Sequence, residues 1–140
     1  MSAVGGRVVL VDSNVIIDVR TEDPVWFAWS AGALSAAADR YELAINPIIY
    51  AELSVDAERI EELDAELPES DYRRLPLPYE AGFLAGKAFV SYRRAGGERR
   101  SSLPDFYIGA HAAVRGLTLL TRDAARYRTY FPTVTLISPK

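Results

Sequence analysis

Four acidic residues in this sequence stand at positions where they could act together on a phosphate ester: Asp12, Glu52, Asp105 and Asp123. Asp12 directly follows an apolar run at residues 8–11, and Asp123 closely follows another at residues 117–121. If both runs are parallel strands, the two acids leave the sheet at the same edge, where open α/β sheets place their ligand sites. Acids that meet without a counter-charge repel and raise each other's pKa, and a divalent cation removes that repulsion.

The residue composition restricts the metal that such a site could hold. The sequence has no cysteine and one histidine, His111, so the available donors are mainly oxygen atoms. Oxygen ligands without sulfur or imidazole companions select Mg²⁺ or Mn²⁺ over Zn²⁺. Such a cation suits phosphoryl transfer, because it lowers the pKa of a bound water and offsets negative charge in the transition state. The pattern leaves open whether one ion or two would bind.

Each of the four acids also has a purely structural interpretation. Asp12 and Asp123 could cap the helix or turn that follows them. Asp105 could complement the dipole of a helix that begins beside it. Glu52 could be a solvated helix residue, although the apolar residues around it weaken that interpretation. The four acids taken together favour a metal site over four unrelated structural roles.

The elements that must position these acids alternate between strand and helix patterns. Short apolar runs predict strands at residues 8–11, 42–45, 117–121 and 134–137. The intervening patterns predict helices at residues 13–18, 25–38, 47–55, 58–67, 80–94 and 104–116, with loops at 68–78 and 98–103. Two helix starts carry a capping residue before a first-turn proline, Asp23–Pro24 and Asn46–Pro47, and Pro104–Asp105 marks a third helix start. Strands joined by helical crossovers imply an α/β fold of three layers, α/β/α, around a mostly parallel central sheet.

Composition and charge narrow the class of protein. The 140 residues contain no linker, so we expect a single domain over residues 1–140. We find no apolar run of the ~20 residues that a bilayer span needs, and no signal-peptide pattern, so we expect a cytoplasmic protein without a membrane partner. The net charge is −3, but residues 93–128 carry eight basic and three acidic side chains. This basic segment could attract a phosphate backbone, or could reflect a genome that favours Arg.

Several motifs that contain the acids resemble those of PIN-domain ribonuclease toxins of the VapC type. The resemblance covers nearly the whole chain and rests on the stretches 11–18, 51–53, 104–112, 119–123 and 126–132, together with Leu136–Ile137. It implies a PIN-like fold and Mg²⁺- or Mn²⁺-dependent endoribonuclease activity on an RNA substrate, as the toxin of a type II toxin–antitoxin system. It further implies inhibition by a cognate antitoxin, and homodimers are common among such toxins.

The resemblance also assigns roles to particular residues. It carries over the acidic metal site to Asp12, Glu52, Asp105 and Asp123. Ser13 and Thr121 match small hydroxyl positions beside the first and last acids, where they would hydrogen-bond carboxylates or metal-associated water. Asn14 matches a polar position of the family, and could do the same or could cap a helix. The sequence specificity of cleavage, and the role of the basic loop at residues 93–102, are not indicated.

Other chemically capable residues are interpreted as structural. His111 lies six positions after Asp105, off the acid face of its helix, and Trp26 and Trp29 are expected to pack. One competing function is a catalytically silent PIN-like module that binds RNA or protein. The other is an aspartyl-phosphate phosphatase-like domain, which is disfavoured because residue 14 is Asn and no lysine ends a strand.

Overall fold

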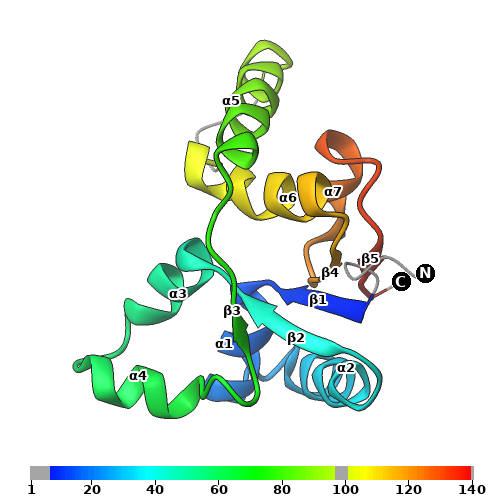
Figure 1. The fold of residues 1–140 in the computed structure, drawn as a ribbon. Coiled ribbons are helices and arrows are strands. Elements are labelled where there is room, and N and C mark those ends of the chain that lie inside the picture. Colours follow the sequence, from blue (N-terminus) through cyan, green and yellow to red (C-terminus); the bar gives the residue numbers. More distant parts are fainter. Residues whose placement is uncertain (1–6, 97–100, 140) are drawn as a thin grey trace.

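Short strands build a single parallel sheet. Their bounds are β1 Val8–Val11, β2 Glu42–Ile45, β3 Arg73–Arg74, β4 Thr118–Leu120 and β5 Leu136–Ile137. A computed structural model describes residues 7–96 and 101–139, and over these residues the five strands lie in the order β3-β2-β1-β4-β5 (Figure 1). Every strand pairing is parallel, which confirms the predicted α/β fold. The four residues of β1 are buried, as expected for a central strand covered on both faces.

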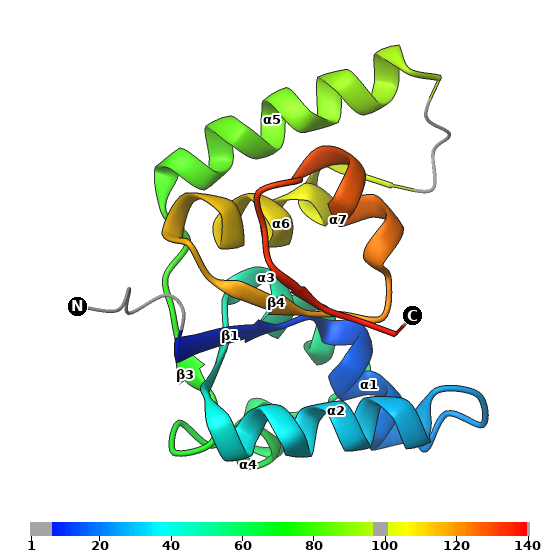
Figure 2. The same cartoon turned by 90° about the vertical axis from the view of Figure 1, so that its right-hand side faces the viewer.

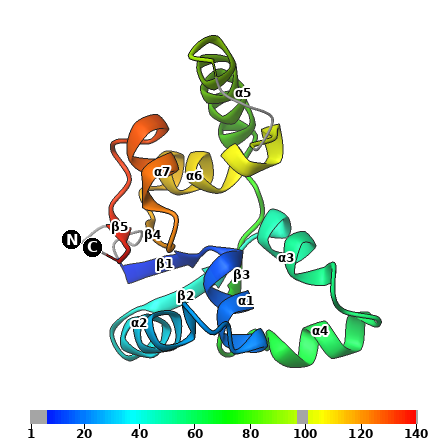
Figure 3. The ribbon, with the colours of Figure 1, turned by 180° about the vertical axis from the view of Figure 1, so that it is seen from behind.

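The helices cover both faces of this sheet. Their bounds are α1 Ser13–Thr21, α2 Phe27–Arg40, α3 Pro47–Ser54, α4 Ile60–Glu66, α5 Tyr79–Arg94, α6 Leu103–Arg115 and α7 Ala124–Tyr130. Figures 1 and 2 show α1, α2 and α4 on one side of the sheet and α5, α6 and α7 on the other, with α5 outermost over α6. Viewed from behind, α3 and β5 lie at opposite ends of the molecule (Figure 3). None of the helices in the described residues is long and apolar enough to span a bilayer.

The register of the two central strands sets the position of the candidate site. Val11 at the end of β1 pairs with Leu120 at the end of β4. The backbone N–H of Asp12 continues this ladder by donating to the carbonyl oxygen of Leu120 at 2.9 Å. The residues that follow β1 and β4 therefore emerge side by side at one edge of the sheet, as predicted.

Some local predictions were wrong. The stretch 68–78 was expected to be a loop, but β3 pairs there with the edge of β2. The helix α7 was not predicted. The start of α2 lies later than expected, because Asp23 Oδ1 accepts hydrogen bonds from the N–H groups of Val25 and Trp26 and forms a turn instead of the helix start. Of the predicted loop 98–103, residues 98–100 lie outside the described residues, and Leu103 already belongs to α6.

A tight contact holds α6 against the C-terminal part of the chain. Gly109 in α6 is buried, and a Cβ built on it would lie 2.4 Å from Cδ2 of Phe131 and 2.9 Å from Cδ1 of Tyr127. The backbone of α6 can approach these two rings only because residue 109 has no side chain. This contact fixes the end of α7 against α6.

Candidate active site

Asp12 lies at the centre of a buried hydrogen-bond network. Its Oδ2 atom accepts hydrogen bonds from Thr121 Oγ1 at 2.8 Å, from the Tyr127 hydroxyl at 2.9 Å and from Asn14 Nδ2 at 3.3 Å. Asp12 occupies the N-cap position of α1, but its side chain makes no capping hydrogen bond. The Asp12 side chain therefore does not cap α1, contrary to its purely structural interpretation.

The environment of Asp12 perturbs its ionisation. Burial raises the pKa of Asp12, whereas the hydrogen bonds from Thr121 and Tyr127 oppose that rise. All three side-chain donors lie on Oδ2, and no side chain among the described residues donates to Oδ1. The side-chain donors thus hold the carboxylate through Oδ2, and the backbone N–H of Ser13 is a further donor to the same carboxylate.

Glu52 is brought to Asp12 by the packing of α3 against α1. Its Oε1 atom accepts a hydrogen bond of 2.5 Å from the Ser13 hydroxyl, which neighbours Asp12 in sequence. Burial raises the pKa of the half-buried Glu52, and the negative charges of Asp12 and Asp105 raise it further. Asp12 and Asp105 are therefore both close enough to Glu52 for their charges to act on it.

Asp123 reaches the network mainly through its backbone. Its N–H group donates to Thr121 Oγ1 at 3.0 Å, and the same hydroxyl donates to Asp12. The Asp123 side chain makes no capping hydrogen bond to α7, and its Oδ2 lies 3.6 Å from a guanidinium nitrogen of Arg126. Asp123 thus stands beside Asp12 with a basic neighbour.

Asp105 is the acid least integrated into the network. Its Oδ2 accepts a hydrogen bond of 2.6 Å from the Ser102 N–H and one of 3.3 Å from the Ser102 hydroxyl, which stabilises the first turn of α6. Asp105 therefore has the helix-start role that was its structural interpretation, in addition to its electrostatic effect on Glu52.

The donor chemistry of the cluster fits a hard divalent cation. Its ligand atoms would be carboxylate and hydroxyl oxygens, which Mg²⁺ and Mn²⁺ prefer, and burial together with the charges of Asp12 and Asp105 raises the pKa of Glu52. Nevertheless, no three His, Cys, Asp or Glu side chains in the described part of the chain converge closely enough to hold one ion together. The four-acid metal site therefore stays a prediction.

Sequence reasoning missed three residues at this site. Tyr127 and Arg126 lie in the family-like stretch 126–132, but neither of them was assigned a role from the sequence. Arg122 donates from Nε to Asp18 Oδ2 at 2.8 Å and lies over the ring of Trp26 at 5.3 Å. The same buried Asp18 oxygen accepts a hydrogen bond of 2.7 Å from Ser30, so this partly buried ion pair joins α1 and α2 to the loop that carries Asp123.

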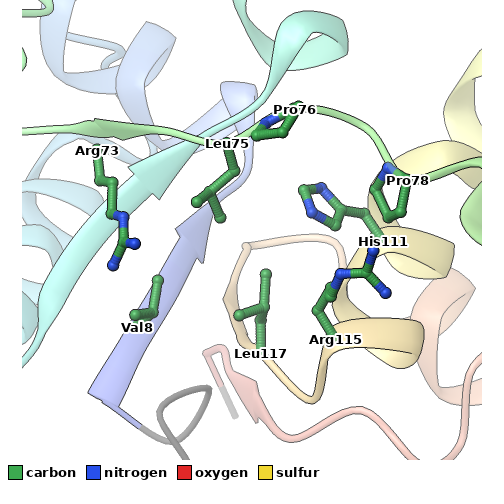
Figure 4. A pocket seen from close by; sticks show the side chains of 8 residues that line it. All are labelled: Val8, Arg73, Leu75, Pro76, Pro78, His111, Arg115 and Leu117. Atoms are coloured by element: carbon green, nitrogen blue, oxygen red, sulfur yellow. The ribbon is translucent and has the colours of Figure 1, made fainter.

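His111 lies away from the acids. It is buried on α6, where it lines a separate pocket with Val8 and Leu117 (Figure 4). Its Nδ1 is 3.0 Å from Asn46 Nδ2, and burial lowers its pKa to about 4. These contacts agree with the structural role predicted for His111.

Comparisons with known proteins agree with this architecture. The family model of the PIN domain matches residues 9–132. No curated protein matches the chain.

Among solved structures, VapBC2 from Rickettsia felis bound to a promoter DNA fragment is 18% identical, with a TM-score of 0.71 and coverage of 95% of this chain and 99% of that one. VapBC-1 from nontypeable Haemophilus influenzae is 17% identical, with a TM-score of 0.70 and coverage of 94% and 97%. VapBC-5 from Mycobacterium tuberculosis, a member of the VapBC family of toxin–antitoxin systems, is 20% identical, with a TM-score of 0.58 and coverage of 96% and 98%.

Proposed function

Because the chain belongs to the PIN domain family, whose model spans residues 9–132, we propose that it is a metal-dependent endoribonuclease. We further propose that it is the toxin of a toxin–antitoxin pair and that it acts as one domain in the cytoplasm. The observation that carries the proposal is the setting of Asp12. A buried carboxylate with raised pKa, oriented by Thr121 and Tyr127 beside a second raised-pKa acid, Glu52, supports the proposal of a cation site.

The metal would be Mg²⁺ or Mn²⁺. We propose that it is held by the four acids of the cluster: Asp12, Glu52, Asp105 and Asp123. When bound, such an ion activates water and offsets the charge of the phosphodiester. Its binding would also relieve the repulsion that raises the pKa of Glu52.

The other side chains of the cluster hold these acids in place. Thr121, Tyr127 and Asn14 fix the orientation of Asp12, and Ser13 fixes that of Glu52. A carboxylate whose rotamer is set by neighbours loses little entropy when it binds a ligand. Arg126 contributes positive charge close enough to Asp12 and Glu52 to oppose the rise of their pKa, and that charge would attract a phosphate group.

The proposed partners follow from the names of the similar structures. Several of these structures are VapBC complexes, and one is described as a toxin–antitoxin system. We therefore propose that the chain binds a cognate antitoxin protein, and that it forms a homodimer as toxins of this type commonly do.

The test is cleavage mapping on total cellular RNA. Wild-type protein should produce defined new 5′ ends with Mn²⁺ or Mg²⁺, and none with a chelator. Asp12→Asn should lose at least about 100-fold of this activity, because it removes a negative ligand from the cluster. Glu62→Gln, which changes an exposed acid on α4, is the matched control and should cleave normally. Intact RNA under every condition, from folded protein, would refute the proposal.

A metal titration of stability separates the nuclease from a silent binding module without using activity. An ion that binds only the folded state stabilises it by about 2.7 kcal/mol at 100 times its dissociation constant. We expect Mn²⁺ to raise the melting temperature of the wild type and of Glu62→Gln, but not of Asp12→Asn. If Mn²⁺ has no effect on the wild type, the silent PIN-like module becomes the better interpretation.

A further inference from the structure

A cavity beside the acid cluster is lined mainly by aromatic, hydroxyl and basic side chains. It has a volume of about 290 Å³ and is lined by Tyr92, Ser101, Asp123, Arg126 and Tyr130, and we call it the tyrosine pocket. Tyr92 comes from the end of α5, and Arg126 and Tyr130 come from α7. Asp123 belongs both to the pocket and to the acid cluster, so whatever fills the pocket lies next to the candidate active site.

The two tyrosines are held in place by a buried aromatic residue. Their ring centroids are 5.8 Å apart at an interplanar angle of 76°. Tyr92 lies 5.4 Å from the ring of Phe106 and Tyr130 lies 5.6 Å from it, and Phe106 itself is fully buried. Both tyrosines are half-buried, so each ring has one part fixed in the core and another part facing the pocket. Rigid aromatic surfaces of this kind are platforms on which nucleobases stack.

Arg126 connects the tyrosine pocket to the acids. Its guanidinium lies 3.6 Å from Asp123 Oδ2, and its side chain keeps 27% exposure. Its positive charge also acts on Asp12 and Glu52. A guanidinium in this position can form a bidentate contact with a phosphate that lies between the acids and the tyrosines.

We propose that the tyrosine pocket binds the base of one unpaired RNA nucleotide next to the scissile phosphate, with Arg126 on a neighbouring phosphate. The proposal rests on the ribonuclease function proposed above and names the part of the site that selects the cleavage sequence. The pocket volume lies at the lower end of ligand sites, about 300 Å³, which suits a single base. A neutral base suits this pocket because it can stack on the two tyrosines without adding negative charge beside Asp123.

Binding of short RNA in the presence of EDTA tests this proposal without metal or cleavage. The probes are fluorescein-labelled single-stranded octamers of U, A and C, measured by anisotropy. Tyr130→Leu should weaken the best-bound octamer by about 5- to 100-fold, the usual effect of losing one stacked base, and should change the ranking of the three. Tyr130→Phe keeps the ring and should bind within about 3-fold of the wild type. Phe83→Leu removes an aromatic that is 71% exposed on α5, away from the pocket, and should change nothing.

Arg126→Gln tests the phosphate contact separately. It should weaken all three octamers by the same factor and reduce the salt dependence of binding by about one phosphate contact, without changing their ranking. Base selection and phosphate attraction would then belong to different residues of the same pocket.

Other outcomes decide against the proposal. Tyr130→Leu protein that is folded by urea titration yet binds all three octamers like the wild type would overturn it. If Tyr130→Leu does not fold, photocrosslinking of 4-thiouridine RNA to wild-type protein decides, because crosslinks that avoid Tyr92 and Tyr130 would also overturn it. If Tyr130→Leu binds RNA normally but no longer binds a protein partner, the pocket belongs to that partner and the proposal is wrong. Failure of wild-type protein to cleave any RNA would refute the nuclease function, while the EDTA binding result would still decide on the pocket.

Discussion

The Tyr127 hydroxyl lies 2.9 Å from Asp12 Oδ2, and the two side chains are only 1% and 5% exposed. Burial raises the pKa of Tyr127 well above its usual value, and the negative charge of Asp12 raises it further. The phenol therefore keeps its proton and acts only as a donor to the carboxylate. This contact links α7 directly to the end of β1.

Replacing this donor should weaken both stability and activity. In Tyr127→Phe, Asp12 Oδ2 keeps Thr121 and Asn14 but loses a buried hydrogen bond, which should cost about 1 to 3 kcal/mol in the free energy of unfolding. RNA cleavage should fall as well, because Asp12 becomes less well oriented. Urea titration and a cleavage assay measure the two effects. Tyr72→Phe changes another buried tyrosine, and the same loss of activity there would show that Tyr127 has no special role.

Gly109 should tolerate no side chain. In Gly109→Ala, the new Cβ would collide with the rings of Phe131 and Tyr127, and such overpacking costs about 1 to 3 kcal/mol. Gly86→Ala is the matched control, because a Cβ at that helical position meets nothing within 4 Å. It should stabilise the protein by about 0.5 to 1 kcal/mol. Urea titration of both variants checks the prediction, which fails if they shift in the same direction.

The partly buried ion pair between Arg122 and Asp18 should matter more than an exposed one. In Arg122→Gln, Asp18 is left 1% exposed with only the Ser30 hydroxyl as a side-chain donor, which should cost about 2 to 4 kcal/mol. Adding Asp18→Asn should recover part of this loss, because it removes the unpaired charge. Glu66→Gln breaks an exposed pair with Arg20 and should cost less than about 1 kcal/mol. The unfolding free energies of these three variants check the prediction, which fails if the double variant is no more stable than Arg122→Gln.

His111 should make the fold sensitive to mild acid. Its folded pKa of about 4 lies below the ordinary 6.5, so the unfolded chain binds a proton first as the pH falls. The protein should therefore be fully stable above pH 6.5 and lose stability between pH 6.5 and 4, by about 3 kcal/mol at most. His111→Gln cannot take up this proton. The difference in unfolding free energy between wild type and His111→Gln should shrink over that range, and a constant difference would contradict the prediction.

The central elements were predictable because their signals are local. β1 is a continuous apolar run that ends at a charged residue, and β2 and the proline-marked start of α3 have equally clear boundaries. Asn46 accepts the N–H of Ile49, as an N-cap should. These signals were sufficient to place Asp12 and Asp123 at the same edge of the sheet.

The remaining features depend on tertiary contacts. β3 is only Arg73–Arg74, two exposed residues in a proline-rich stretch, and it is a strand only because β2 offers an edge. α7 carries no capping side chain at Asp123, so nothing in its sequence marks its start. The role of Tyr127 depends on the distance of its hydroxyl from Asp12, which no periodicity encodes. The helix-start role of Asp105 was among its predicted interpretations. The sequence did not indicate that Asp105 would bond to Ser102 and also act electrostatically on Glu52.

The hydrogen-bond donors to Asp12 lie late in the chain, so they are synthesised long after Asp12 itself. Thr121 and Tyr127 follow Asp12 by 109 and 115 residues in the chain. Contacts between residues so far apart form late, and a growing polypeptide leaves the ribosome with its N-terminal part first. A nascent chain that ends before residue 121 contains the strands β1, β2 and β4 but neither of these hydroxyls. The hydrogen bonds from Thr121 and Tyr127 that orient Asp12 can therefore form only after synthesis has passed Tyr127.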